Sequence, residues 1–131
     1  MNINVVISDD SPSLEGHENI SIPNLGQVPN SICRSIILSG TLNFLNDEQI
    51  LALLSKLRHG GAVSITCPDA MQVAHSFCLG RIDLMKFSEM TANRLRSRTL
   101  EETMSFLQNN GYQISSATVN DLMFHVEARR P

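Results

Sequence analysis

Short polar segments follow two of the apolar runs in this sequence. Asp9 and Asp10 come after the first run, and Ser39, Gly40 and Thr41 come after the third. Paired carboxylates can bind magnesium or act as an acid and a base, and polar groups at the carboxyl end of a buried strand can face a ligand. A turn after the first run and a simple strand-to-helix loop after the third explain the same residues without a ligand, so both interpretations stay open.

An arginine cluster offers a second kind of chemistry. Arg94, Arg96 and Arg98 lie close enough in the sequence to meet one phosphate together. Such a cluster is more often a solvated face or a set of ion-pair partners. The formal net charge of −3, from 10 basic and 13 acidic residues, also weighs against a nucleic-acid partner, because nucleic-acid binding depends on neutralising phosphates.

The remaining candidates for metal ligands and nucleophiles have the wrong spacing. The three cysteines, Cys33, Cys67 and Cys78, contain no Cys-x-x-Cys pair, and the four histidines are scattered along the chain. A zinc site needs such ligands at short spacing. Cys33 and Cys67 lie in or beside apolar runs, which predicts small buried thiols in a reducing compartment. We therefore assign no catalytic residue and no metal ligand.

Length and composition predict one soluble domain over residues 1–131. Of these residues 42% are hydrophobic, which is enough for a single core of ordinary size. The longest apolar runs fall short of the ~18 residues that a membrane span needs, and the N-terminus has no basic segment followed by an apolar one. We expect a cytoplasmic protein that does not associate with membranes.

Alternating elements predict an α/β fold with a mostly parallel sheet. Strands are predicted over 2–8, 19–22, 32–38, 62–67, 112–118 and 122–128. The alternation of strands and helices indicates parallel strands joined by right-handed crossovers. The last two strands are close enough to form an antiparallel hairpin with its turn at Asn120 and Asp121.

Capping residues mark the helices. Asn46, with Gln49 three residues on, predicts the start of a helix whose last turn contains Lys56 and Arg58. Thr99 starts another helix with a Thr-x-x-Glu capping box. The segment 69–96 is less regular, and its apolar residues suggest two short helices.

Four segments together resemble the C-terminal part of class I S-adenosylmethionine-dependent methyltransferases. They read VPNSICRSIILSGTLNFLND, ILALLSKLRHGGAVSITCPD, SRTLEETMSFLQNNGYQISSATV and LMFHVEARRP. The second resembles the family's helix, glycine pair and fifth strand, usually written L-x-P-G-G, with His59 where the family often has proline. The order and spacing of the segments extend the resemblance over residues 28–131. It implies a reduced Rossmann-like fold.

Residues 1–27 depart from this family. Its members need a glycine-rich turn after the first strand, because the methionine end of the cofactor approaches the backbone closely. Here residues 8–13 stand where those glycines are expected, and Gly16 is the sole glycine nearby. About ten residues join the first two strands, whereas a parallel crossover needs about a dozen or more. We interpret 1–27 as a degenerate cofactor-binding part from which a helix and a strand are deleted.

The resemblance implies where a cofactor would lie if one binds. S-adenosylmethionine would then contact Ser8, Asp9, Ser39, Gly40 and Thr41. Without the glycine-rich turn, we instead expect no cofactor and no catalytic activity.

The resemblance also implies that the two capped helices share one face of the sheet. A parallel sheet needs cover on both faces, and an exposed apolar face of more than several hundred Å² is unusual in a monomer. We therefore predict a methyltransferase-like scaffold or interaction protein that forms a homo-oligomer or binds a protein partner, of a kind that suits a phage or other mobile genome. The alternative is a minimal S-adenosylmethionine-dependent methyltransferase, active alone or with a partner subunit.

Overall fold

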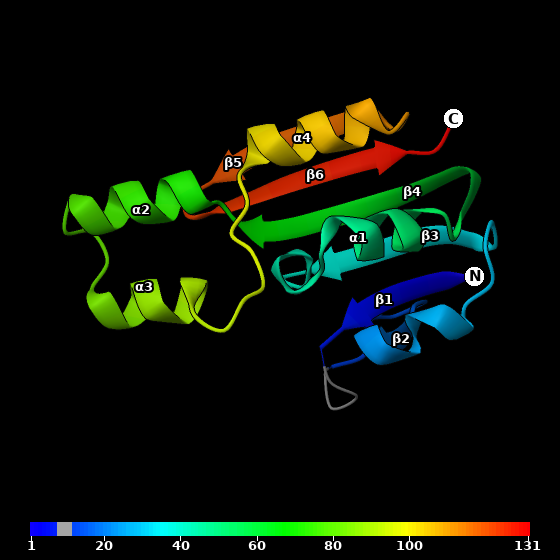
Figure 1. Cartoon of the computed structure of the whole chain (residues 1–131), viewed down its shortest axis with the longest axis horizontal. Helices are drawn as coiled ribbons and strands as arrows, with labels where there is room; N and C mark the ends of the chain where they lie inside the picture. The colour runs from blue at the N-terminus through cyan, green and yellow to red at the C-terminus, as the bar shows by residue number, and fades with distance from the viewer. Residues whose placement is uncertain (8–11) are drawn as a thin grey trace.

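A computed structural model describes residues 1–7 and 12–131. One six-stranded sheet with the order β2-β1-β3-β4-β6-β5 runs through the molecule (Figure 1). Its strands are β1 Asn2–Val6, β2 Glu18–Ser21, β3 Cys33–Ser39, β4 Leu57–Pro68, β5 Gln113–Asn120 and β6 Met123–Arg129. The helices are α1 Asp47–Leu54, α2 Ala70–Cys78, α3 Leu84–Thr91 and α4 Leu100–Asn109, with the short 3-10 helices η1 Ile22–Gln27 and η2 Leu42–Phe44. The predicted α/β class is confirmed.

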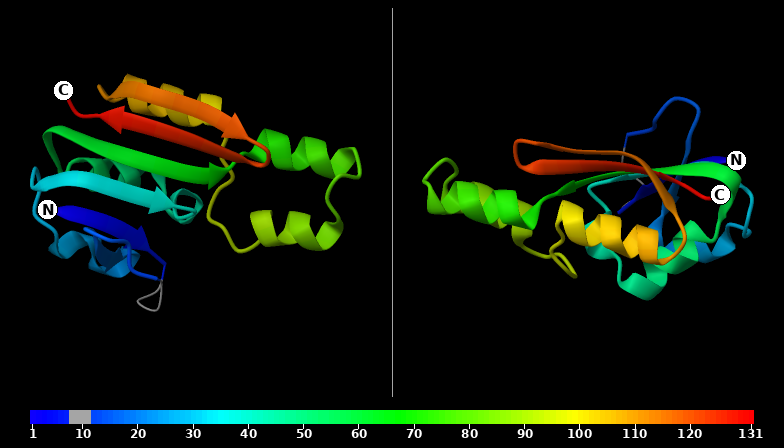
Figure 2. Two further views of the ribbon diagram at one scale, coloured as in Figure 1. Left: turned by 180° about the vertical axis from the view of Figure 1, so that it is seen from behind. Right: turned by 90° about the horizontal axis from the view of Figure 1, so that it is seen from above.

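The parallel strands and their connections define the two faces of the sheet. β1 pairs in parallel with β2 on one side and with β3 on the other, and β3 pairs in parallel with β4. The chain therefore leaves β1 in one direction across the sheet and leaves β3 in the opposite direction. Right-handed crossovers place two such connections on opposite faces. Figure 2 shows the described residues before β2, 12–17, on the face opposite α1, and residues 7 and 12–17 of this connection contain no helix.

The C-terminal strands complete the sheet in antiparallel fashion. β6 pairs with β4 and with β5, so the predicted hairpin is confirmed, but its turn is shifted by one residue. Asn120 pairs with Met123, which leaves Asp121 and Leu122 as the turn. Asp121 adopts a φ of 58°, a conformation that aspartate tolerates better than most residues. The Leu122 carbonyl oxygen accepts the Asp69 N–H at 2.8 Å, and this bond fixes the turn against the end of β4.

α1 begins as predicted and ends earlier. Asn46 Oδ1 accepts the Gln49 N–H at 2.8 Å, and Gln49 Oε1 accepts the Asn46 N–H at 2.9 Å, which is the predicted capping box. The prediction that Lys56 and Arg58 form the last turn of this helix is wrong. Lys56 instead extends into the protein, where its Nζ donates to the Val28 carbonyl oxygen at 2.8 Å.

The core lies between one face of the sheet and the helices α1 and α4. Figure 2 shows both helices on that face, as predicted. The strand residues in the core include Ile3, Val5, Ile36, Leu38, Leu57, Val63, Ile65, Phe124 and Val126. α1 adds Ile50, Leu53 and Leu54, and α4 adds Leu107. β1, β3, β4 and β6 therefore direct alternate apolar residues to the same side.

The opposite face carries no helix in the described part of the chain, and its chemistry differs from the prediction. Paired residues on neighbouring strands share a face, and one row across this face reads Asn19, Asn4, Ile37, Ser64, Glu127 and Ser116. A second row contains Ser39, Thr66, His125 and Thr118. The expected exposed apolar face is therefore wrong, because the alternation of the strands turns polar residues outward. Residues 12–17 cover part of this face, where His17 Nε2 lies 3.3 Å from Ser35 Oγ.

The segment 69–96 forms the two short helices that its sequence suggests, α2 and α3. They make a helical hairpin that extends beyond the end of the sheet and covers neither face (Figures 1 and 2). Phe77 of α2 stacks on Phe87 of α3, with ring centroids 4.7 Å apart. All residues of α3 are described, and none of them is buried.

The close approach of β3 and β4 can be tested at Gly61. A Cβ atom at this position would lie 2.8 Å from the Cys33 carbonyl oxygen and 2.9 Å from that of Arg58. Both are backbone atoms and cannot rotate away. We expect Gly61→Ala to lower the free energy of unfolding by about 1–3 kcal/mol, the usual cost of overpacking, in a urea titration followed by circular dichroism.

Gly26→Ala is the matched control for this substitution. Nothing lies within 4 Å of a Cβ atom built on Gly26, so its free energy of unfolding should change by less than about 0.5 kcal/mol. Equal stability of the two variants would contradict the crowding at Gly61.

Candidate functional site

The connection after β1 leads to β2 on one side, and the connection after β3 leads to β4 on the other side. The switch point of the sheet therefore lies between β1 and β3, at the carboxyl edge of the parallel strands. Open α/β sheets bind ligands in the crevice outside this edge, at such a switch point. Val5 pairs with Leu38, so the ends of β1 and β3 lie side by side, and Ser39 ends β3 next to the last residues of β1. The predicted Ser8 and Asp9 lie outside the described residues.

The three residues predicted after β3 differ in their exposure. Ser39 is exposed, and Gly40 is partly exposed. Gly40 adopts a φ of 74°, which glycine tolerates without strain, and its N–H donates to the Thr66 carbonyl oxygen at 2.7 Å. Thr41 is only 2% exposed, and its hydroxyl has no hydrogen-bond partner among the described residues. Two of the three predicted residues therefore face solvent at this edge, and the third is an unused polar group behind them.

The glycine nearest to β1 lies at the wrong end of that strand for a cofactor. The Gly16 carbonyl oxygen accepts Nδ2 of Asn2 at 3.3 Å, and Asn2 is the first residue of β1. A glycine that lets a cofactor approach the backbone is needed directly after the strand, at its carboxyl end. Residues 7–15 contain no glycine, so the chain supplies none on the β1 side of the switch point.

The neighbouring part of this edge, above β3 and β4, is occupied by the chain itself. The N–H groups of Leu95 and Arg96 donate to the Asn43 carbonyl oxygen at 2.9 and 3.1 Å. The Cys67 thiol donates to Oδ1 of the same asparagine at 3.2 Å. Burial raises the pKa of Cys67 to about 12, so this thiol stays protonated at neutral pH and is a poor nucleophile.

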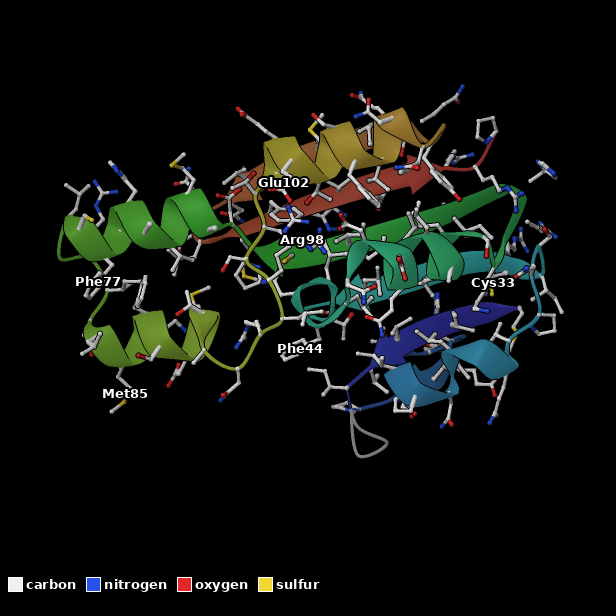
Figure 3. The ribbon with its side chains drawn as sticks, viewed as in Figure 1. Cys33, Phe44, Phe77, Met85, Arg98 and Glu102 are labelled. Atoms are coloured by element: carbon white, nitrogen blue, oxygen red, sulfur yellow. The ribbon has the colours of Figure 1, made fainter. Side chains whose placement is uncertain are left out.

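The arginine cluster supplies ion pairs at the same edge. Arg96 bridges Asp47, at 3.1 Å, and Glu102. Arg98 is buried, and its Nη2 donates to the Leu45 carbonyl oxygen at 3.0 Å and lies 3.4 Å from Asp47 Oδ1. Figure 3 shows Arg98 directed from its loop toward the interior beside Glu102. The interpretation of the cluster as ion-pair partners is therefore confirmed for these two residues.

Arg94 interacts with an aromatic ring. Its guanidinium carbon lies 5.3 Å from the centroid of the Phe44 ring, within the range of a cation–π interaction, and its Nη1 donates to the Ala92 carbonyl oxygen at 2.7 Å. All three arginines of the cluster thus contact their own chain, and Arg96 and Arg98 have carboxylate partners there.

A single carboxylate, that of Asp69, joins the two helices that begin at this edge. Its Oδ1 accepts the N–H groups of Met71 and Gln72 at 3.0 and 3.1 Å, which caps α2. Its Oδ2 accepts the Leu100 N–H at 3.0 Å, in the first turn of α4. The first role is local in the sequence, but the Leu100 partner is 31 residues away and gives no local signal. Asp69 is buried, so its carboxylate serves the fold.

A chain of three polar side chains lies on the open face of the sheet and was missed in the sequence. Thr66 Oγ1 lies 2.9 Å from His125 Nδ1, and His125 Nε2 lies 3.5 Å from Glu127 Oε1. A hydroxyl, an imidazole and a carboxylate in this order can activate a nucleophile. These side chains project from an open strand surface, and acyl transfer also needs aligned donors for an oxyanion, so we assign no reaction to them.

The described part of the chain offers neither a metal site nor a membrane-spanning helix. Residues 1–7 and 12–131 contain no group of three or more histidine, cysteine, aspartate or glutamate side chains that could hold a metal ion. Within the same residues, no helix has both the length and the apolar character to cross a bilayer.

Solved structures of methyltransferases share this fold. No protein-family model and no curated protein matches the sequence. The chain superposes on an S-adenosylmethionine-dependent methyltransferase from Mesorhizobium loti with a TM-score of 0.65 and 14% identity over 98% of this chain and 80% of the other. An S-adenosylmethionine-dependent methyltransferase from Archaeoglobus fulgidus gives a TM-score of 0.63 and 14% identity, over 98% of this chain and 75% of the other. The pyocyanin biosynthetic protein PhzM gives a TM-score of 0.58 and 18% identity, over 86% of this chain and only 35% of PhzM.

These likenesses establish the fold. The chain has a class I methyltransferase-like, Rossmann-like α/β fold, as the sequence resemblance implied. It spans about one third of PhzM and about three quarters or more of the two other proteins.

The double role of Asp69 predicts an unusually large effect of its removal. Asp69→Ala would remove the cap of α2 and the bond to the first turn of α4 together and leave three partly buried N–H groups without this partner, which should lower the free energy of unfolding by about 2–4 kcal/mol. Urea titration followed by circular dichroism measures this loss.

Asp83→Ala is the matched control, because Asp83 caps only α3 through one exposed bond of 2.8 Å to the Lys86 N–H. Asp83→Ala should lower the free energy of unfolding by about 1 kcal/mol or less. If Asp69→Ala were no more costly than Asp83→Ala, the link between the two helices would contribute nothing to stability.

Proposed function

We propose that this protein is a non-catalytic, methyltransferase-like scaffold that forms a homo-oligomer through its α2–α3 hairpin. The single observation that carries this proposal is the exposed apolar surface of that hairpin. The fold that positions a cofactor in other proteins would here hold the α2–α3 hairpin at a fixed angle to the sheet for assembly.

The apolar surface of the hairpin is concentrated in four side chains. Met71, Leu79, Leu84 and Met85 are each more than half exposed, with Met85 the most exposed at 72%. Figure 3 shows Met85 directed away from α2, whereas Phe77 lies between the two helices. A helix as short as α3 is marginal in water without a packed face. Burial against another molecule would supply that face.

A second copy of this chain is the partner that fits this surface best. A stable interface buries about 800 Å² on each partner, and the four exposed side chains would supply the apolar part of such an interface. Two hairpins related by a two-fold axis would present the same surface to each other and could pack as four antiparallel helices. The open sheet face is a poorer candidate, because Ser64, Thr66 and Glu127 make it polar.

The absence of catalysis in this proposal rests on the switch point. The β1 side has no glycine after the strand, and Gly16 lies at the other end of β1. The edge above β3 and β4 is occupied by the contacts of Asn43 with residues 95 and 96. We therefore infer that no S-adenosylmethionine is bound and that no methyl transfer occurs.

A minimal methyltransferase is the second candidate, and one observation favours it. Ser39 and Gly40 face solvent beside the end of β1, with the unused Thr41 hydroxyl behind them. Together with Ser8 and Asp9, these residues would line the cofactor site of an enzyme that is active alone or with a partner subunit.

The chemistry of the chain also bears on its compartment and its other partners. Cys33, Cys67 and Cys78 are free thiols in the structure, as is usual in a reducing compartment, so we place the protein in the cytoplasm. Nucleic acid is not proposed as a partner, because two of the three arginines of the cluster, Arg96 and Arg98, already form ion pairs within the chain.

The assembly proposal predicts that one charge on the hairpin dissociates the oligomer. Wild-type protein should sediment as a dimer at micromolar concentration. Met85→Glu would bury an unpaired carboxylate in the interface, so its dissociation constant should rise at least tenfold, equivalent to about 1.4 kcal/mol. Sedimentation velocity over a dilution series measures the change.

Leu51→Glu is the matched control, since Leu51 is an exposed leucine on α1, away from the hairpin. It should leave the dimer intact. A monomeric wild-type protein, or equal dissociation of both variants, would refute assembly through α2–α3.

Calorimetric titration separates the scaffold from the enzyme. We expect no heat of binding when S-adenosylmethionine or S-adenosylhomocysteine is added to the protein at up to about 1 mM, because the glycines that permit close approach are missing. Micromolar binding that Gly40→Val weakens would establish the cofactor site and contradict the non-catalytic proposal. Gly26→Val, at a glycine with open surroundings, serves as the control.

A further inference from the structure

Three arginines line one cavity at the amino edge of the sheet, the edge opposite the switch point. Arg34 on β3, Arg58 near the start of β4 and Arg129 at the end of β6 border a hollow of about 390 Å³. Ser35 and Ala62 lie between them on the open face of the sheet. The cavity falls within the size range of small-molecule sites.

Strand register builds this cavity from residues that are distant in the sequence. Ser35 pairs with Ala62, and Ala62 pairs with Arg129, so two small residues form the floor beside one arginine. The pairing of β3 with β4 is irregular between Cys33 and Ser35, and such a bulge turns the neighbouring side chain toward a new direction.

The glycine pair brings the other two arginines together. Gly60 adopts a φ of 80°, and a Cβ atom on Gly61 would lie 2.9 Å from the Arg58 carbonyl oxygen and 3.2 Å from that of Arg34. The backbones that carry these two arginines therefore pack closely around Gly61. The absence of a side chain at Gly61 permits this approach.

The charges of these arginines are not neutralised by their neighbours. In residues 1–7 and 12–131, the side chains of Arg34, Arg58 and Arg129 make no ion pair and no hydrogen bond, unlike those of Arg96 and Arg98. A local excess of positive charge thus occurs in a chain whose net charge is −3. Like charges gathered in one hollow repel each other, and an anion between them would remove that repulsion.

We propose that this cavity binds the phosphate group of a small phosphorylated molecule. The planar fork of a guanidinium matches phosphate oxygens in pairs, and the Ser35 hydroxyl offers a further donor on the cavity floor. His17 Nε2 lies 3.3 Å from that hydroxyl and would hold it in place. The short extent of this basic surface, three arginines around one hollow, favours a small ligand over a polymer, which would need a longer basic surface. The site is independent of the hairpin interface and of the switch point.

Calorimetric titration with pyrophosphate at low ionic strength tests the proposal. Wild-type protein should bind with a dissociation constant in the micromolar to low millimolar range. The double variant Arg58→Gln and Arg129→Gln should bind at least tenfold more weakly. Both side chains are exposed, so the variant should keep the circular dichroism spectrum and urea midpoint of the wild type.

A control variant with the same change of net charge distinguishes the cavity from general electrostatic attraction. Arg81→Gln combined with Lys86→Gln removes two exposed cations from the hairpin region and should leave pyrophosphate binding unchanged. Equal weakening by both double variants, or no binding by the wild type, would overturn the proposal.

A second ligand separates the two sources of phosphate. A short single-stranded DNA should bind more weakly than pyrophosphate, since only one phosphate enters the cavity. Tighter binding of the DNA that is lost in Arg58→Gln and Arg129→Gln would overturn the small-molecule assignment in favour of a nucleic acid.

Discussion

The short connection between β1 and β2 is the constraint on which the rest of the structure depends. Residues 7–17 are too few for a helix and a return to the sheet, and the described residues 12–17 lie on the face opposite α1, as the right-handed rule requires. That face consequently lacks a helical layer in the described structure (Figure 2). It is compatible with water because polar residues such as Ser64, Thr66 and Glu127 occupy it, while the apolar strand residues point to the side that α1 and α4 cover.

The same connection alters the carboxyl edge of the sheet. The sequence has no glycine between residues 7 and 15, whereas dinucleotide sites of this fold class use glycines directly after the first strand. The adjoining edge is used for structure: Asn43 and the ion pairs of Arg96 and Arg98 fix the chain there. Asp69 accepts hydrogen bonds from the first turns of both α2 and α4, and these bonds fix the start of the α2–α3 hairpin relative to α4.

Two surfaces of different chemistry lie at opposite ends of the sheet. The apolar side chains of α2 and α3 lie beyond the carboxyl edge, and the arginines 34, 58 and 129 surround a hollow at the amino edge. A methyltransferase-like fold does not by itself define an activity. In this chain the parts that differ from an ordinary surface are the hairpin and the arginine cavity, and both lie outside the switch point where this fold class usually binds its ligands.

The sequence by itself determined the local features. The capping box at Asn46, the cap at Thr99, the alternation of the strands and the two short helices in 69–96 depend on residues within a few positions of one another. The tertiary structure alone decided which distant groups meet: Arg98 binds a carbonyl 53 residues away, and Asp69 reaches α4 across 31 residues. It also decided that the uncovered face is polar as a whole. These outcomes depend on strand order and register, and a one-residue shift in register would exchange the two faces of a strand. Only the packed sheet fixes that register.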